Sequence, residues 1–186
     1  MPLQFFSPNA KNTGAALSTS FNSKDAAFYF NLIKQVSWNE TTKTGSFKGG
    51  AMANIKFSPD EAGGFIETVR TKGESKFFHS FGDETSSGNF RYYCIENPKG
   101  NKEGFGLTVK KGDTEWKVGF SLGSAERLME HLKFGFEHIF SAIYAADKKA
   151  FETRMADKPK PVNKPVDDEP ADQEPEQKTN EPDEDF

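Results

Sequence analysis

The sequence predicts an α+β fold with two helices, arranged as what looks like a repeated ββββα unit. Three observations predict this class. Most of the body alternates apolar and polar residues with the two-residue period of strands. Two segments instead carry an apolar stripe at helical spacing, and each stripe must be buried against a sheet. The order along the chain is strands, a helix, four strands and a second helix, although the two halves show no repeat in sequence.

The first strands flank a short turn. Alternation predicts strands over Gly14–Phe21 and Ala26–Trp38, and the turn residues between them, Asn22–Asp25, predict a hairpin. A third strand, Ser46–Phe57, leads directly into the first helix. After that helix, turns rich in Gly, Asn and Asp separate four further expected strands, Glu74–Phe81, Asn89–Glu96, Gly104–Lys111 and Thr114–Leu122.

The first helix is predicted by a clear N-terminal signal. Ser58 suits the N-cap, Pro59 suits the first helical position, and Glu61 completes a capping box with Ser58. The residues that follow form one apolar stripe, consisting of Ala62, Phe65, Ile66 and Val69. The helix is expected to end at Thr71–Gly73.

The second helix is predicted from near Ser124 to about Ala146, with fraying expected as far as Met155. Its apolar residues recur every three or four positions, at Leu128, Leu132, Phe136, Ile139 and Ile143.

We expect one domain, residues 1–155, followed by an acidic tail, residues 156–186. The domain carries 20 Lys and Arg against 17 Asp and Glu, a net charge of +3, whereas the tail carries 4 against 11, a net charge of −7. A mildly basic domain joined to a strongly acidic tail suits a protein that binds a polyanion and whose own tail competes with that polyanion for the basic surface. The same charges also suit an ordinary soluble domain, and a net charge of +3 requires the cations to be gathered on one face.

The sequence contains no persuasive enzymatic or metal-binding motif. His79 lies in an expected strand, His131 and His138 lie on one expected helix, and the single cysteine, Cys94, excludes an intramolecular disulfide framework. We therefore expect no enzymatic activity, no metal and no cofactor. Because no signal peptide and no long apolar segment are present, the expected location is the cytoplasm, or the host cytoplasm for a phage protein.

The end of the tail has a feature that solvation does not explain. The last 22 residues hold ten acidic side chains, one lysine and four prolines, so we expect them to be disordered. A solubility tail is one interpretation. However, the chain ends with a bulky aromatic residue, and this end resembles the C-terminus of bacterial and phage single-stranded-DNA-binding proteins. The resemblance implies that the tail competes with DNA and that its last four residues bind replication and repair enzymes: Asp183, Glu184, Asp185 and Phe186.

Three strings in the body resemble the Whirly family, which binds single-stranded DNA and is best known from plant organelles. They are Phe57–Gly63 at the first helix, Glu74–His79 in the next strand and Gly104–Val109 in a later strand, and the resemblance covers residues 12–146. It implies two packed antiparallel sheets with the helices at one side. It also implies DNA on the outer sheet surfaces and edges, and a homodimer or homotetramer formed through the helices.

Single-stranded DNA binding requires aromatic faces that stack on bases and cations that contact phosphates. Several expected strands pair these residue types, and the predicted interface contains Lys34, Trp38, Phe47, Lys48, Lys76, Arg91, Tyr93, Trp116 and Lys117. The alternative for each is an ordinary strand position, with aromatics in the core and lysines in solvent, and this alternative is strongest for Trp116. Because stacking accepts any base, we expect binding without sequence preference.

These features favour a single-stranded-DNA-binding protein that acts in phage or bacterial DNA replication, recombination or repair, with a tail that recruits partner proteins. Two other functions remain open: a transcription or RNA-binding regulator of the same fold, and an acidic scaffold that does not bind DNA. The OB barrel is the competing fold, and the second long helix argues against it.

Overall fold

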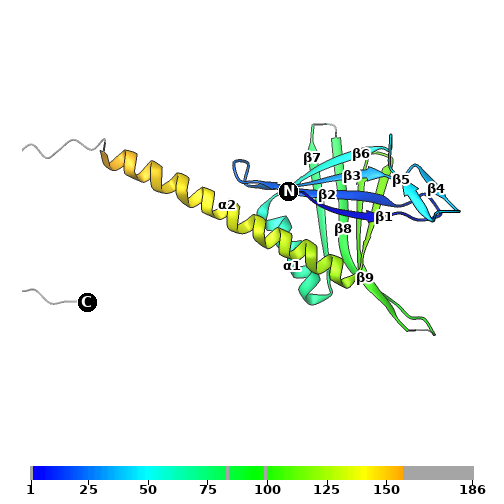
Figure 1. Cartoon of the computed structure of the whole chain (residues 1–186). Coiled ribbons are helices and arrows are strands. Elements are labelled where there is room, and N and C mark those ends of the chain that lie inside the picture. Colours follow the sequence, from blue (N-terminus) through cyan, green and yellow to red (C-terminus); the bar gives the residue numbers. More distant parts are fainter. Residues whose placement is uncertain (1, 83, 99, 157–186) are drawn as a thin grey trace, which may run out of the picture.

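The computed structural model describes residues 2–82, 84–98 and 100–156, and it contains two four-stranded antiparallel sheets and two helices (Figure 1). Sheet A has the strand order β1-β2-β3-β6, with β1 (Leu3–Ser7), β2 (Ala15–Asn22), β3 (Ala27–Lys34) and β6 (Met52–Phe57). Sheet B has the order β10-β9-β8-β7, with β7 (Glu74–Phe81), β8 (Glu84–Ile95), β9 (Lys102–Lys111) and β10 (Thr114–Phe120). A short hairpin, β4 (Ser37–Asn39) and β5 (Thr44–Ser46), is inserted between β3 and β6.

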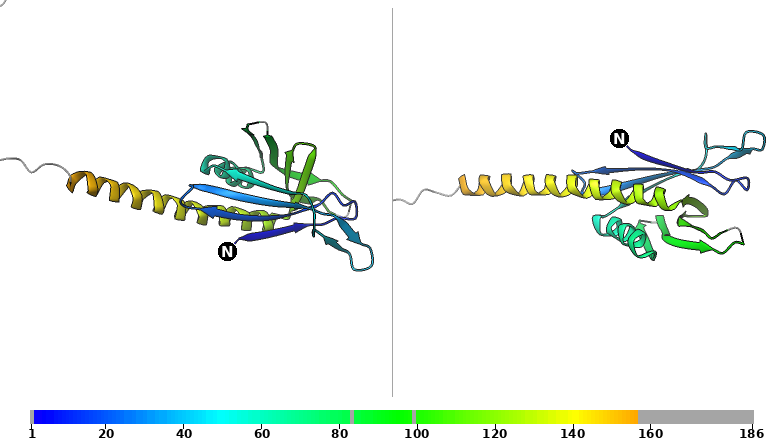
Figure 2. Two further views of the ribbon diagram at one scale, coloured as in Figure 1. Left: turned by 90° about the horizontal axis from the view of Figure 1, so that it is seen from above. Right: turned by 60° about the horizontal axis from the view of Figure 1, so that its bottom comes forward.

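The chain follows the predicted ββββα order twice, which confirms the α+β class. Sheet A is followed by α1 (Pro59–Thr71) and sheet B by α2 (Leu122–Ala156). The strands of sheet A run across those of sheet B (Figure 1), and α2 lies between sheet A and α1 (Figure 2). Of the predicted tail, residues 156–186, only Ala156 belongs to the described part of the chain, so the proposed domain boundary stays a prediction.

Phenylalanine rings join the two sheets into one core. Phe57 of sheet A packs edge-on against Phe77 of sheet B, with ring centroids 4.9 Å apart. On α1, Phe65 stacks on Phe30 of sheet A at 5.5 Å and meets Phe90 of sheet B edge-on at 5.5 Å. Such pairs add about 0.5–1.5 kcal/mol each beyond the burial of apolar area. The inner faces of both sheets are therefore committed to the core, which leaves their outer faces for binding.

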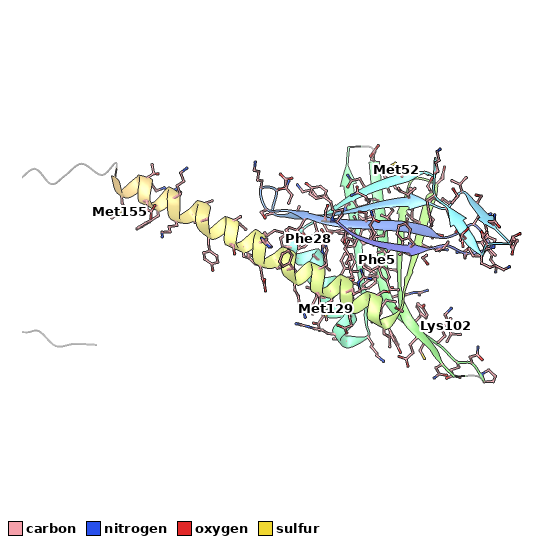
Figure 3. All side chains as sticks on the ribbon, viewed as in Figure 1. Phe5, Phe28, Met52, Lys102, Met129 and Met155 are labelled. Carbon is pink, nitrogen blue, oxygen red and sulfur yellow. The ribbon has the colours of Figure 1, made fainter. Side chains whose placement is uncertain are left out.

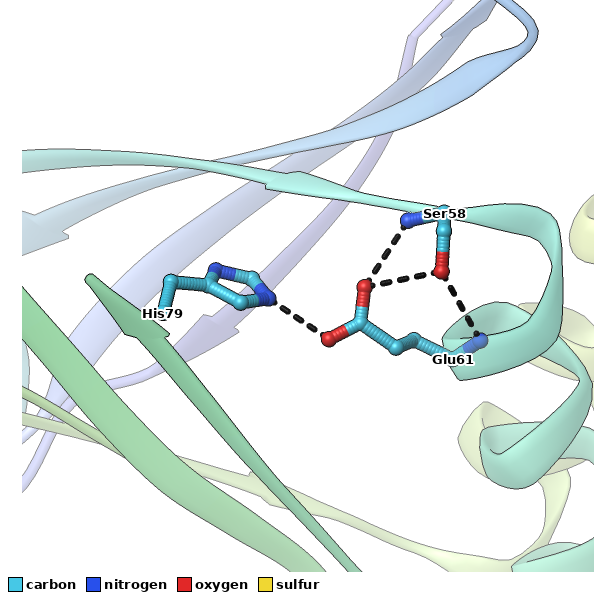
Figure 4. Close-up of polar contacts among 3 residues, drawn as sticks. All are labelled: Ser58, Glu61 and His79. Carbon is cyan, nitrogen blue, oxygen red and sulfur yellow. Dashed lines mark hydrogen bonds and ion pairs between the residues drawn. The ribbon is translucent and has the colours of Figure 1, made fainter. Parts of the chain in front are cut away.

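The N-terminus of α1 forms as predicted and links the helix to sheet B. The Ser58 hydroxyl accepts a hydrogen bond from the Glu61 N–H at 3.3 Å, and the Ser58 N–H donates to Glu61 Oε2 at 2.9 Å (Figure 4). Glu61 Oε1 lies 2.6 Å from Nε2 of His79 on β7. Burial raises the pKa of the Glu61 carboxyl, but the hydrogen bonds from Ser58 and His79 outweigh it, so the pKa lies below its usual value of 4.5.

The second helix is longer than predicted. α2 continues to Ala156, well beyond the expected end near Ala146, and it projects from the body (Figure 1). Its first half, which carries Met129, crosses the core, and Phe5 and Phe28 of sheet A lie close to it (Figure 3). Gly135 permits this close approach, because a Cβ at that position would collide with the Phe28 ring. From Phe140 to Met155 every side chain of α2 is exposed.

Sheet A differs from the prediction at its edge. β1 has no counterpart among the expected strands, although it pairs with β2 over its whole length, for example Phe5 with Leu17. The five residues of β1 are too few for a distinct alternation, and their place is set by pairing with β2.

The expected strand Ala26–Trp38 is divided, since β3 ends at Lys34 and β4 begins at Ser37, and the buried Gln35 lies at the break. Its amide nitrogen donates to the Asn9 carbonyl at 2.9 Å and to the Ser37 carbonyl at 3.0 Å, which ties two loops together. The expected strand Ser46–Phe57 is likewise divided, since β5 ends at residue 46 and β6 begins at residue 52.

Candidate nucleic-acid interface

The outer face of sheet B gathers most of the predicted cations. Alternate residues such as Phe90, Leu107 and Val118 point into the core, so their strand neighbours point outward. The register places these neighbours in three cross-strand rows: Phe78, Ser87, Lys110 and Glu115; then Lys76, Asn89, Thr108 and Lys117; then Glu74, Arg91, Gly106 and Gly119. We call these three rows, together with Tyr93 and its partner Gly104, the cationic face.

An open cavity of about 530 Å³ lies on the cationic face. Four cations line it, namely Lys76, Arg91, Lys110 and Lys117, together with the hydroxyl and amide groups of Ser87, Asn89 and Thr108. Glu115 is the acidic residue at its edge. Lys, Arg, Ser, Thr and Asn side chains are the groups that contact phosphate oxygens in nucleic-acid complexes. The cavity is therefore suited to a polyanionic strand.

Two carboxylates neutralise part of this charge. Glu115 lies 2.6 Å from Nζ of Lys117 and 3.8 Å from Nζ of Lys110, and Glu74 lies 3.5 Å from Nζ of Lys76. The hydrogen bond from Lys117 is the main reason that the pKa of Glu115 lies below its usual value. Exposed ion pairs of this kind stabilise a protein by at most about 1 kcal/mol. A phosphate can therefore replace the carboxylate at little cost.

Two aromatic side chains share the cationic face with these cations. Tyr93 is half-buried and lies two residues from Arg91 on the same strand, so the two side chains point the same way. Phe78 is 68% exposed and was missing from the predicted interface. The available signal was strand alternation, because an inward Phe77 requires an outward Phe78.

The remaining predicted residues form a second group at one end of sheet A. Phe47 packs against the exposed Phe6 of β1, with ring centroids 5.9 Å apart. Lys48 is exposed next to it, and the Lys34 N–H donates to the Ala51 carbonyl at 2.8 Å, which holds the turn against the end of β3. Trp38 is half-buried in the β4–β5 hairpin. The predicted residues are thus divided between the cationic face of sheet B and the segment around the β4–β5 hairpin that joins β3 to β6.

Trp116 is a correction to the predicted interface. Its side chain is only 2% exposed, and the indole N–H donates to the Ala51 carbonyl at 2.9 Å. The ring lies in the core on the inner face of β10, where no base can stack on it. Lys117, the next residue, points outward for the same reason of alternation.

Other chemistry has little support among the described residues. Residues 2–82, 84–98 and 100–156 contain no group of three or more His, Cys, Asp or Glu side chains arranged to hold a metal ion. Within the same ranges, no helix has the length and apolar character needed to cross a membrane. The absence of enzymatic activity and the cytoplasmic location stay predictions.

The comparisons with known proteins agree with the geometry at the level of the fold. Arabidopsis thaliana WHY1 superimposes with a TM-score of 0.53 and 11% identity, covering 86% of this chain and 95% of WHY1. The plant transcriptional regulator PBF-2 gives 0.52 and 14% identity, covering 80% of this chain and 86% of PBF-2. The fold is Whirly-like. Trypanosoma brucei MRP1/MRP2 also matches, with a TM-score of 0.50, 14% identity and coverage of 74% and 84%.

In sequence, neither a protein-family model nor a curated protein matches the chain. The structural likeness therefore carries the fold alone.

Proposed function

We propose that this protein binds single-stranded DNA, without sequence preference, on the cationic face of sheet B. The observation that carries the proposal is the gathering of four cations around one cavity, on a sheet face that also carries the exposed Phe78 and the half-buried Tyr93. Cations that follow the phosphates and rings that stack on bases are the two elements of single-strand binding. The Whirly-like fold supports the same surface, because the helices pack on the other side of the sheet.

Binding in this mechanism exchanges ion pairs. Phosphates replace Glu115 beside Lys117 and Lys110, and they replace Glu74 beside Lys76, while condensed counterions are released from the strand. The bases face the sheet, where stacking on an aromatic ring contributes about 1–3 kcal/mol per base whatever its identity. Sequence independence follows from this mode of contact.

We infer a role in phage or bacterial DNA replication, recombination or repair, in which the acidic tail recruits partner enzymes. The tail lies outside the described residues, so this inference rests on its sequence: a net charge of −7 that ends in an aromatic residue. Deleting Asp183–Phe186 is expected to abolish recruitment of partner enzymes while leaving DNA affinity unchanged or higher. A loss of DNA affinity on this deletion would contradict the tail mechanism.

We also infer that the protein forms a homodimer or homotetramer through the projecting part of α2. This segment exposes five large apolar side chains: Phe140, Ile143, Tyr144, Phe151 and Met155. A single helix in water is only marginally stable, so covering this stripe with α2 of a second copy stabilises both. Replacing Tyr144 and Phe151 with Glu should reduce the mass measured by sedimentation, whereas Lys149→Glu on the same helix should not.

The direct test is a fluorescence titration of a dT oligomer with the intact protein and with a variant truncated after residue 164, each at two salt concentrations. We expect binding that weakens with salt and is at least as tight for the truncated protein. A complete absence of binding at low salt would refute the proposal and favour the acidic scaffold.

A transcription or RNA-binding role is the second candidate, because one structural neighbour is a transcriptional regulator. Competition of RNA and duplex DNA against the labelled dT oligomer separates the two functions. Preferential displacement by RNA or duplex would favour the regulator.

A further inference from the structure

The cationic face contains a patch that lacks side chains. Gly106 of β9 and Gly119 of β10 are cross-strand partners, and Gly104 precedes Gly106 by two residues on the same face. A Cβ built on Gly106 would meet no atom within 4 Å, so packing does not require glycine there. Glycine weakens the interior of a strand, and it often marks a position where another molecule approaches the backbone.

Tyr93 borders this patch, and its ring lies over the sheet. Its cross-strand partner, Gly104, is buried: a Cβ built there would collide with the Phe120 carbonyl oxygen and lie 2.8 Å from the Tyr93 hydroxyl oxygen, so backbone and ring already cover this glycine. The phenol therefore extends across β9 instead of standing away from the sheet. Arg91 borders the patch as the partner of Gly106, and Lys117 lies in the next row along β10.

The dimensions of the patch match one aromatic base. Neighbouring strands lie about 4.8 Å apart, and alternate residues on one strand lie about 6.6 Å apart. A flat ring can lie against the bare backbone of this area, next to the phenol and between two cations.

We propose that the glycine patch, formed by Gly106 and Gly119 beside the Tyr93 ring that covers Gly104, holds one unpaired base. Tyr93 contacts the base, and Arg91 and Lys117 contact the phosphates on its two sides. This inference rests on the proposed nucleic-acid binding and adds the feature that selects single strands. A base inside a duplex is covered on both faces by its neighbours, so it cannot lie against the sheet.

The test compares a dT oligomer with an oligomer of the same length in which every base is replaced by an abasic sugar. Both have the same phosphates, so the dissociation constant of the abasic oligomer divided by that of the dT oligomer measures base contacts alone. Gly106→Val fills the patch with a residue that favours strands. We expect it to lower this ratio by about 5- to 150-fold, the equivalent of one lost stacking contact, without changing the salt dependence.

Two further variants complete the design. Tyr93→Leu keeps apolar bulk over Gly104 but removes the ring, and it should lower the same ratio. Ser80→Val adds a branched side chain to the same face of β7, away from the patch, and should leave the ratio unchanged. Thermal unfolding checks that each variant is folded.

Each outcome is decisive. If the wild-type protein binds neither oligomer, the proposed function fails and this inference fails with it. If both oligomers bind and neither Gly106→Val nor Tyr93→Leu changes the ratio, the patch does not hold a base, although nucleic-acid binding stands. An equal loss of affinity for both oligomers in Gly106→Val would show that the strand backbone, and not a base, crosses the patch.

Discussion

Removing two of the four cations at the cavity should flatten the salt dependence of DNA binding by a calculable amount. Each phosphate contact to a single strand contributes about −0.7 to the slope of log affinity against log salt. Lys76, Arg91, Lys110 and Lys117 together contribute about −2.8, so between about 50 and about 200 mM salt they reduce affinity about 50-fold. In the double variant Lys76→Gln/Lys117→Gln this contribution falls to about −1.4, which corresponds to a loss of affinity of about sevenfold over the same salt range.

The assay is fluorescence anisotropy of a labelled dT oligomer at several salt concentrations. The matched control is Lys24→Gln/Lys148→Gln, which removes the same charge from the β2–β3 turn and from the projecting end of α2. The net charge of both variants is identical, so a difference in slope of about 1.4 reports contact with the cationic face and not the general field of the protein. Equal slopes in the two double variants would refute the assignment of this face.

Four other substitutions have defined outcomes. Glu115→Gln frees two lysines, so DNA binding should tighten about two- to fivefold in the same anisotropy assay. Gly63→Ala should stabilise the protein by about 0.5–1 kcal/mol because the new Cβ has open space. Gly135→Ala should destabilise it by about 1–2 kcal/mol because the new Cβ meets the Phe28 ring. Urea unfolding measures both changes. The pKa of Glu61 lies below 4.5, so its stabilisation is present above that pH and is lost as pH falls through the lowered pKa. The stability gap between wild type and Glu61→Gln should therefore shrink on acidification to about pH 3.

Local chemistry made α1 predictable from the sequence. The capping box between Ser58 and Glu61 forms within four residues, and the stripe behind it needs only a helical period. The end of β3 could not be predicted in this way. Gln35 lies where the strand ends, and its side chain binds Asn9 and Asn12, which are distant in sequence and belong to the loop between the paired strands β1 and β2.

The interface was predictable where two residues two positions apart share one face of a strand. It was not predictable where two adjacent residues were both assigned to the interface. Arg91 and Tyr93 both point outward, as the period of a strand requires. Trp116 and Lys117 are adjacent, so at most one of them can face the solvent side of the sheet. The sequence shows the alternation but not which face the other sheet covers, and that choice puts Trp116 in the core. The role proposed for Gly106 has no local signal in the sequence, because it depends on Tyr93 and Gly119 on the neighbouring strands.

The outer faces of the two sheets differ in charge, and this difference bears on where DNA and the tail are expected to compete. On the outer face of sheet A, the strand residues include one charged side chain, Lys56, among polar and apolar groups such as Asn31 and Met52. The cationic face of sheet B carries four cations around its cavity against two carboxylates. A tail with a net charge of −7 is therefore attracted to the face that we assign to DNA.

If the two compete there, removing residues 165–186 should tighten DNA binding most at low salt, where the attraction of the tail is least screened. The difference between the intact and truncated proteins should disappear as salt rises. The measurement is the ratio of the two dissociation constants across a salt series. A ratio that is independent of salt would mean that the tail acts only on other proteins and does not occupy the cationic face.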